Sequence, residues 1–343
     1  MSFSEIIGQE KAITMLQGIL RRNRLAGSYL FCGESGIGKK TAAINFAKAV
    51  NCLDLGNKQN SSQDSFLPIT HHPSPITVYD ACEVCESCLK INAGTHPDIL
   101  IIAPEDRIIR VGEKGEANTI RFIEESLSFR PFEGKKKVII VDDADLMNQQ
   151  AANAFLKTLE EPPPDSLIIL VSARPDRLPA TIRSRCSRVP FDPLSRVACR
   201  DILAEKMSAE DAEQIARLSL GRPGFALSSD VRENRDWFID LLHAMTQTEK
   251  DSWASREEME RWFDLALTFI RDLAVYRITG KTSHLINADL AETLGKTGKS
   301  VDVQGIIELY KELGFIKNML PFNLNKSLTW NYTASLLRKE LYS

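Results

Sequence analysis

The sequence predicts an α/β domain with a parallel sheet, followed by material that is almost entirely helical. Two observations support this prediction. Short, continuously apolar segments alternate with helical patterns up to about residue 190, as they do in parallel sheets that are covered by helices on both faces. From residue 192 to the end the pattern is helical, without an internal repeat or a heptad run.

Each element of the α/β part has its own signal. Strands are expected at four apolar segments, 28–32, 98–102, 137–143 and 166–172, all suited to burial. Helices are expected over 11–25, 42–50, 120–128 and 149–160, and the last is stopped by three consecutive prolines. Residues 54–75 are rich in Ser, Asn, Gln and Pro and lack apolar periodicity, so we expect a flexible surface insertion there.

Composition restricts the classes of protein to consider. The 343 residues are 43% hydrophobic and carry a net charge of −3, which excludes a mainly disordered chain and a strongly basic, histone-type protein that covers nucleic acid. This length suggests two to three domains. The N-terminus lacks the pattern of a secretory signal, and no apolar run is long enough to span a membrane. We therefore expect a cytoplasmic protein whose cysteines are reduced.

A glycine-rich segment, Gly33 to Thr41, lies between the first expected strand and the helix at 42–50. Its Gly-x4-Gly-Lys spacing is that of a Walker A loop, in which backbone N–H groups cradle phosphates and the lysine reaches the β- and γ-phosphates. The apolar segment 137–143, which ends in two aspartates, is typical of a Walker B strand, in which the acids hold Mg²⁺ and polarise the attacking water. The residues expected to bind nucleotide are Gly33, Gly36, Gly38, Lys39, Lys40, Thr41, Asp142 and Asp143.

Two of these positions depart from the pattern of an ATPase. Lys40 stands where a Ser or Thr hydroxyl normally ligates Mg²⁺, and an ammonium group cannot ligate a cation. Thr41 comes one residue late. Asp143 is one methylene shorter than the usual glutamate, so its reach toward an attacking water is in doubt. The sequence therefore leaves open whether ATP and Mg²⁺ bind tightly.

Three cysteines at Cys-x2-Cys spacing indicate a metal site, because thiolates at this spacing can hold one Zn²⁺ from a tight turn. Four thiolate ligands leave no open coordination position, so we expect structural zinc. The fourth ligand is less certain: Cys52 is expected, and His71, His72 and His96 are alternatives. Free cysteines and an iron–sulfur cluster are the competing interpretations. The expected ligands are Cys52, Cys82, Cys85 and Cys88.

Several motifs together resemble the AAA+ subunits of bacterial clamp loaders. The resembling segments are 6–10, 33–41, 82–88, 96–98, 138–145, 151–163 and 178–186. The most specific is Ser184-Arg185-Cys186, which follows a Leu-Pro-x-Thr-Ile run. The resemblance covers residues 1–227, about two thirds of the chain, and the remaining third is assigned by order alone.

The resemblance implies a domain organisation and a set of partners. It implies a RecA-like nucleotide domain over 1–190 with a zinc module at about 52–90, a helical lid over 191–235, and a helical collar over 236–343 that joins five subunits in a ring. The implied partners are the tau/gamma motor subunits and the delta subunit of the DNA polymerase III clamp loader. This chain would contact the sliding clamp and primed DNA as part of the assembled complex.

The resemblance also implies a role for Arg185, as an arginine finger that points at the nucleotide held by a neighbouring subunit. Arg183 and Arg188 are nearby competitors. Members of the family that hydrolyse ATP keep a lid arginine, and this position aligns here with Gly224, while Arg222 lies two residues early.

Lys40, Asp143 and Gly224 thus depart together from the pattern of the hydrolysing subunits. We therefore expect a subunit that assists ATP-driven clamp loading during replication, with weak or absent ATPase and no polymerase chemistry of its own. The alternatives are an ATP-hydrolysing motor subunit of the same assembly, and a zinc-dependent DNA-binding module that reuses a P-loop fold. The near-neutral charge argues against the second.

Overall fold

The computed structural model describes residues 2–55, 79–228, 231–247, 253–297 and 301–342. Residues 56–75 of the expected insertion lie outside this part of the chain. The described chain divides into two compact units, residues 1–206 with 221–225, and residues 207–220 with 226–343. The finer division into nucleotide, lid and collar domains stays a prediction.

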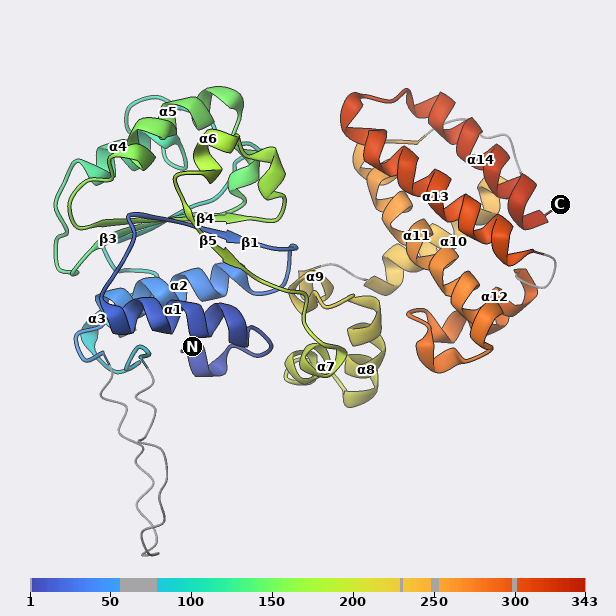
Figure 1. Ribbon diagram of the computed structural model, residues 1–343, viewed down its shortest axis with the longest axis horizontal. Coiled ribbons are helices and arrows are strands. Elements are labelled where there is room, and N and C mark those ends of the chain that lie inside the picture. Colours follow the sequence, from blue (N-terminus) through green and yellow to red (C-terminus); the bar gives the residue numbers. More distant parts are fainter. Residues whose placement is uncertain (1, 56–78, 229–230, 248–252, 298–300, 343) are drawn as a thin grey trace, which may run out of the picture. The chain divides into compact units, whose positions relative to one another are not determined.

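A five-stranded parallel sheet forms the centre of the first unit, which confirms the predicted α/β class (Figure 1). The strand order is β2-β3-β4-β1-β5. The central strands are mostly apolar and fully buried because helices cover both of their faces. The strands are β1 (Ser28–Cys32), β2 (Ile99–Ile102), β3 (Lys137–Val141), β4 (Ser166–Ser172) and β5 (Ser187–Pro190).

The two edge strands differ from the sequence prediction. The sequence predicts burial of 98–102, but β2 lies at an edge of the sheet and Ile101 is 36% exposed. The other edge strand, β5, is not predicted by the sequence pattern. Only Val189 of its four residues is buried, because this strand pairs with β1 alone and leaves its other side open. A strand with so little apolar content has no clear pattern in the sequence.

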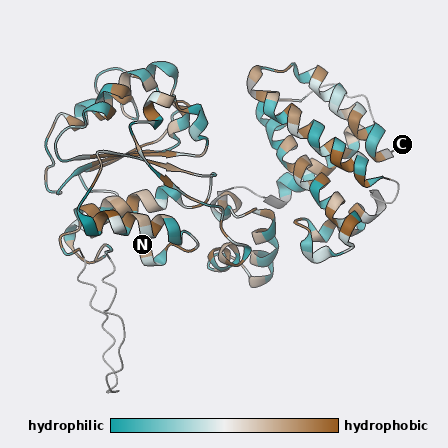
Figure 2. Cartoon of the chain, viewed as in Figure 1, coloured by the Kyte–Doolittle hydropathy of each residue, from teal (hydrophilic) through white to brown (hydrophobic). Residues whose placement is uncertain are grey.

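Helices cover both faces of the sheet, with their apolar sides toward it (Figures 1 and 2). On one face lie α1 (Glu10–Arg22), α2 (Lys39–Asn51) and α3 (Glu86–Asn92), and on the other α4 (Ile120–Leu127), α5 (Gln149–Glu160) and α6 (Ala180–Arg183). The side chains of Thr119 and Asn148 cap α4 and α5 by accepting backbone N–H groups, which fixes where these helices begin.

The rest of the described chain is helical. The helices are α7 (Arg196–Ala204), α8 (Ala209–Leu218), α9 (Pro223–Ser228), α10 (Val231–Gln247), α11 (Arg256–Thr279), α12 (Ala291–Thr297), α13 (Val303–Met319) and α14 (Lys326–Tyr342). Short 3₁₀ turns occur at Phe3–Glu5, Ala144–Leu146, Pro175–Arg177, Thr282–His284, Ala288–Leu290 and Leu320–Phe322. Within the described residues, no helix combines the length and apolar character that crossing a bilayer requires.

The second unit has its own hydrophobic core, built on aromatic side chains. Trp253 packs against Trp330 with their rings 4.8 Å apart, and against Trp262 at 5.3 Å. Phe238 and Phe263 extend this contact along α10 and α11. Aromatic rings at these distances add specific packing energy to the burial of their area. A separate core indicates that this helical unit is stabilised by its own contacts.

Candidate functional site

The phosphate-binding loop joins the end of β1 to the start of α2. Gly38 is the N-cap of α2 with φ of 93°, and Gly36 has φ of 78°, values that cost glycine far less than other residues. The first turn of α2 contains no acidic residue, so the positive end of the helix dipole faces the loop uncompensated. The local structure is therefore that of an anion-binding loop.

A pocket of about 280 Å³ lies over this loop. It gathers all the residues expected to bind nucleotide except Gly33, and it adds three that were not expected: Ser35, Val171 and Gly224. The expected residues that line it are Gly36, Gly38, Lys39, Lys40, Thr41, Asp142 and Asp143. The expected phosphate loop and acidic segment thus meet in one cavity.

The charged groups of this pocket are partly withdrawn from water. Burial raises the pKa of Asp143, and the carboxylates of Asp142 and Asp145 raise it further. Burial lowers the pKa of Lys39, whose Nζ donates a hydrogen bond to the backbone carbonyl of Glu34. A phosphate oxygen beside Lys39 would favour its charged form, because an opposite charge offsets the cost of desolvation.

Lys40 occupies the position at which a P-loop site would bind Mg²⁺. Its Nζ lies 2.9 Å from Oδ2 of Asp142, the carboxylate that was expected to hold Mg²⁺. Mg²⁺ requires a near-octahedral set of oxygen ligands, and an ammonium group at this position offers none and repels the ion. The residues present therefore do not fit the Mg²⁺–ATP complex of a working ATPase.

The lid segment contacts the loop through its backbone. The N–H of Gly224 donates to the carbonyl oxygen of Gly36 at 2.8 Å. A Cβ atom at Gly224 would lie 2.9 Å from that oxygen and 3.1 Å from Gly36 Cα, which is too close without a shift of one backbone. A larger side chain at this position, such as the lid arginine that the resemblance implies for hydrolysing subunits, thus has no room without such a shift. Arg222 instead lies 3.6 Å from Glu34 and over the ring of Phe225.

This contact makes a prediction about stability. Gly224→Ala is expected to lower the free energy of unfolding by about 1–3 kcal/mol, the usual cost of overpacking. Urea unfolding followed by circular dichroism measures it. Gly18→Ala is the matched control, because a Cβ there meets nothing within 4 Å. It should be neutral or stabilising in the middle of α1. Equal stability of the two variants would contradict the close contact.

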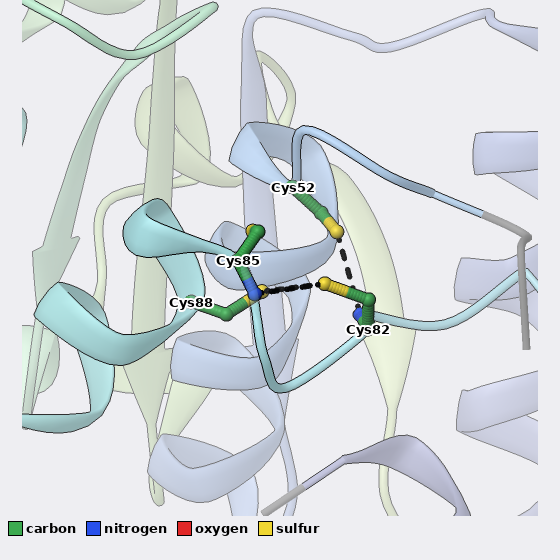
Figure 3. A group of neighbouring side chains, drawn as sticks. All are labelled: Cys52, Cys82, Cys85 and Cys88. Carbon is green, nitrogen blue, oxygen red and sulfur yellow. Dashed lines mark hydrogen bonds between the residues drawn. The ribbon is translucent and has the colours of Figure 1, made fainter.

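The four expected cysteine ligands lie together (Figure 3). Cys52 is the C-cap of α2, Cys82 lies in a loop, Cys85 is the N-cap of α3 and Cys88 lies within α3. Their Sγ atoms all lie within 4.8 Å of one another, and those of Cys82 and Cys88 are 3.9 Å apart. Tetrahedral zinc with bonds of about 2.3 Å separates its sulfurs by about 3.8 Å. The donor set and its spacing fit a metal ion.

Histidine does not join this group in the described part of the chain. His96 is buried, and its Nδ1 accepts a hydrogen bond from the N–H of Asp98 at 3.1 Å. Burial alone would raise the pKa of Asp98, but three backbone N–H groups from residues 132–134 donate to this carboxylate and lower its pKa. His71 and His72 lie outside the described residues. Of the candidates for the fourth ligand, Cys52 is the one placed beside the cluster.

Backbone N–H groups point at the sulfur atoms. The N–H of Cys82 donates to Cys52 Sγ, and that of Cys85 donates to Cys82 Sγ, both at 3.3 Å. Burial raises the pKa of the Cys52 and Cys88 thiols. Burial acts in the same sense on Cys85, but N–H groups of Cys88 and Leu53 outweigh it and lower its pKa to about 7. Such donors favour the thiolate, which is the form that binds a metal.

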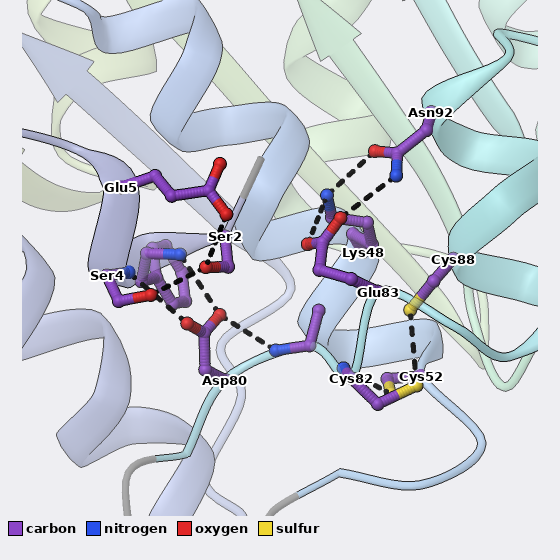
Figure 4. A network of polar contacts seen from close by, with 12 residues as sticks. Ser2, Ser4, Glu5, Lys48, Cys52, Asp80, Cys82, Glu83, Cys88 and Asn92 are labelled. Atoms are coloured by element: carbon purple, nitrogen blue, oxygen red, sulfur yellow. Dashed lines mark hydrogen bonds and ion pairs between the residues drawn. The ribbon is translucent and has the colours of Figure 1, made fainter. Parts of the chain in front are cut away.

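A buried ion pair ties this cluster to the phosphate-loop helix (Figure 4). Lys48 of α2 has a side chain only 1% exposed, and its Nζ lies 2.6 Å from Oε1 of Glu83 and 2.8 Å from Oδ1 of Asn92. Asn92 donates back to Glu83 at 2.9 Å. Asp80 accepts the N–H groups of residues 3 and 4, so the N-terminus is held as well. The cysteine cluster and α2 are thus one connected structure.

Arg185 lies on the surface just after α6, with 32% of its side chain exposed. One terminal nitrogen donates to the carbonyl of Thr181 at 2.7 Å, and the other pairs with Oε1 of Glu160 at the end of α5. The planar guanidinium is therefore held in a defined orientation. Its two competitors are engaged differently. Arg183 pairs with Asp176 at 2.8 Å, and Arg188 lies 3.9 Å from Cys32 Sγ.

The parallel sheet, the loop between β1 and α2 and the acids after β3 define a P-loop α/β domain. Comparison with known proteins narrows this class. The model of the family described as "DNA polymerase III, delta subunit" matches residues 8–195. Because this match covers more than half of the chain, the chain belongs to that family.

Individual relatives give the same result. The chain is 28% identical over 332 residues to DNA polymerase III subunit delta' of Bacillus subtilis, a match that covers 92% of each chain. It is 29% identical to the delta' subunit of Pseudomonas aeruginosa, over 73% of this chain and 70% of the other. The tau subunit of Bacillus subtilis is 33% identical, over 62% of this chain but 32% of its own length. The expected resemblance to this family is confirmed.

Proposed function

We propose that the chain works as a delta-prime-type subunit of the DNA polymerase III clamp loader, assisting ATP-driven loading of the sliding clamp onto primed DNA. The observation that carries this proposal is the match to a delta' subunit along 92% of both chains. The pairing of Lys40 with Asp142 and the absence of a lid arginine at Gly224 suit a subunit that does not hydrolyse ATP at its own site. The partly exposed side chain of Arg185, with its guanidinium held by Thr181 and Glu160, suits a role at a neighbour's site.

The domain roles belong to the same proposal. We assign residues 1–190 to an AAA+ nucleotide domain, 191–235 to a lid and 236–343 to a collar that joins five subunits in a ring. The parallel sheet with its loop after β1 supports the first assignment. The separate aromatic core of the helical unit supports the last only as an independent domain, because a domain has its own hydrophobic core.

The experiment that tests this function is assembly. The chain is mixed with tau/gamma and delta subunits, and the mass of the product is measured by native mass spectrometry. We expect one copy of this chain in a five-subunit complex. The second candidate, a motor subunit, is favoured by the 33% identity to tau, and it predicts that the chain can replace tau/gamma in the complex. Failure to assemble with either set would contradict both.

The chain's own ATPase gives a further prediction. The isolated protein should hydrolyse ATP negligibly, because Lys40 occupies the side of Asp142 that a metal ion would need and the lid cation is missing. A coupled phosphate-release assay measures the rate. Turnover on the order of 1 s⁻¹, ordinary for an enzyme, that disappears in Lys39→Ala would identify a motor subunit instead.

We also propose that the cysteine cluster holds one structural Zn²⁺. Four thiolates of suitable spacing support zinc over a catalytic metal, because they leave no coordination position for a substrate. When bound, the ion would cross-link the end of α2 to the start of α3, since Cys52 follows α2 and Cys85 and Cys88 lie at the start of α3. Its role would be to fix the loop between them.

A further inference from the structure

The pocket over the phosphate loop retains the parts that bind phosphate and lacks the parts that bind metal. The N-terminus of α2 and Lys39 remain, and the cavity of about 280 Å³ is close to the small end of ligand sites. The carboxylate of Asp142 is already neutralised by Lys40. Such a pocket can bind a polyphosphate, even though it excludes Mg²⁺.

Lys40 has the chemistry to stand in for that ion. An ammonium group has three donors and no acceptor, so its ion pair with Asp142 Oδ2 at 2.9 Å, even if it uses one donor, leaves two donors for phosphate oxygens. In an ordinary P-loop site Mg²⁺ connects the acidic strand to the β- and γ-phosphates in the same way. The side chain is 46% exposed and flexible, so it can follow the ligand.

We propose that Lys40 is a built-in substitute for the divalent cation, so that this pocket binds the phosphate chain of a nucleoside polyphosphate without Mg²⁺. A single positive charge replaces a double one, which permits binding but gives less stabilisation to charge that develops on phosphate. Added Mg²⁺ competes with Lys40 and Lys39 for the same oxygens. The inference deepens the proposed function by assigning a ligand mode to the site that does not fire.

Nucleotide binding by the full chain tests this. ATP is titrated into the purified protein by isothermal calorimetry, once in EDTA and once in millimolar MgCl₂. The wild-type protein should bind ATP in EDTA, and Mg²⁺ should leave the affinity equal or weaker. Lys40→Ala should lose about ten- to a hundredfold in EDTA, the value of a charge-assisted hydrogen bond. Lys40→Thr should reverse the metal dependence, so that Mg²⁺ strengthens binding.

Two controls make the result specific. Lys39→Ala should lose binding in both buffers. Lys114→Ala removes the same charge from an exposed loop position that does not line the pocket, and it should bind as the wild type does. Absence of binding in EDTA, or binding by the wild type that requires Mg²⁺, would overturn the inference. Neither result bears on assembly into the complex or on Arg185, so failure here and failure of the proposed function are distinguishable.

Discussion

Replacement of Arg185 by alanine is expected to stop ATP hydrolysis at the one site of the assembled clamp loader that faces this subunit. Arginine fingers acting between chains are worth roughly 10³ to 10⁵ in rate. The guanidinium is always charged and can donate two hydrogen bonds to phosphate oxygens. The ATPase of the complex stimulated by DNA and clamp should fall to the share of its remaining sites, and clamp loading should fall with it.

Arg185 is partly exposed, so the variant should fold and enter the complex normally. Arg183→Ala and Arg188→Ala are the controls for nearby charge, because each removes a guanidinium from the same segment and neither is expected to reach the neighbouring nucleotide. Lys40→Ala should do much less than Arg185→Ala. If the Arg185→Ala complex assembles and loads clamps at the wild-type rate, the chain is a passive scaffold.

Removal of zinc is the second large effect that we expect. Unstripped protein should contain about one equivalent of Zn²⁺ and should be colourless, unlike an iron–sulfur protein. Structural zinc contributes folding energy directly, and loss of the neighbouring contact between Lys48 and Glu83 would leave the buried Lys48 charge unpaired. We expect chelation or Cys52→Ser to cost more than about 3 kcal/mol, roughly 6–12 °C in the Tm of a domain of this size.

Cys186→Ala is the matched control for this experiment. Cys186 is buried away from the cluster, and burial raises its pKa to about 12, so its thiol stays protonated and does not compete for metal. Elemental analysis should find unchanged zinc in this variant and reduced zinc in Cys52→Ser. Less than about half an equivalent in unstripped wild-type protein would rule out the site. Unchanged zinc and Tm in Cys52→Ser would rule out the fourth ligand.

Much of the sheet could be predicted because its central strands are unambiguous. β1 and β4 have the expected bounds, since a strand buried on both faces is a nearly continuous apolar run, here interrupted only by serines at the strand ends. The edge strand β5 could not be predicted, because Ser187 and Arg188 are exposed and nothing in its composition separates it from a loop. The expected burial of 98–102 holds for Asp98 and Ile102 but not for Ile101, because this apolar segment forms an edge strand, and strand order is a property of the fold and not of the segment.

The site was predictable where its residues are adjacent in sequence. The loop and the three clustered cysteines have characteristic spacings, whereas Cys52 joins them only because α2 ends beside α3. The sequence also indicates that Lys40 cannot ligate Mg²⁺, but the partner it takes, Asp142, depends on how β3 lies beside α2. The contact of Gly224 with Gly36 has no local signal, because it joins two distant turns of backbone.

The backbone contact at Gly224 has an evolutionary consequence. A hydroxyl at position 40 and a longer acid at position 143 are each reachable by point mutation, and neither residue takes part in this backbone contact. An arginine at Gly224 would place its Cβ 2.9 Å from the carbonyl oxygen of Gly36, so one of the two backbone segments would have to shift. Acquiring an arginine at this position would therefore cost stability until the backbone at Gly224 or Gly36 had moved, whereas substitutions at the other two positions would not meet this contact.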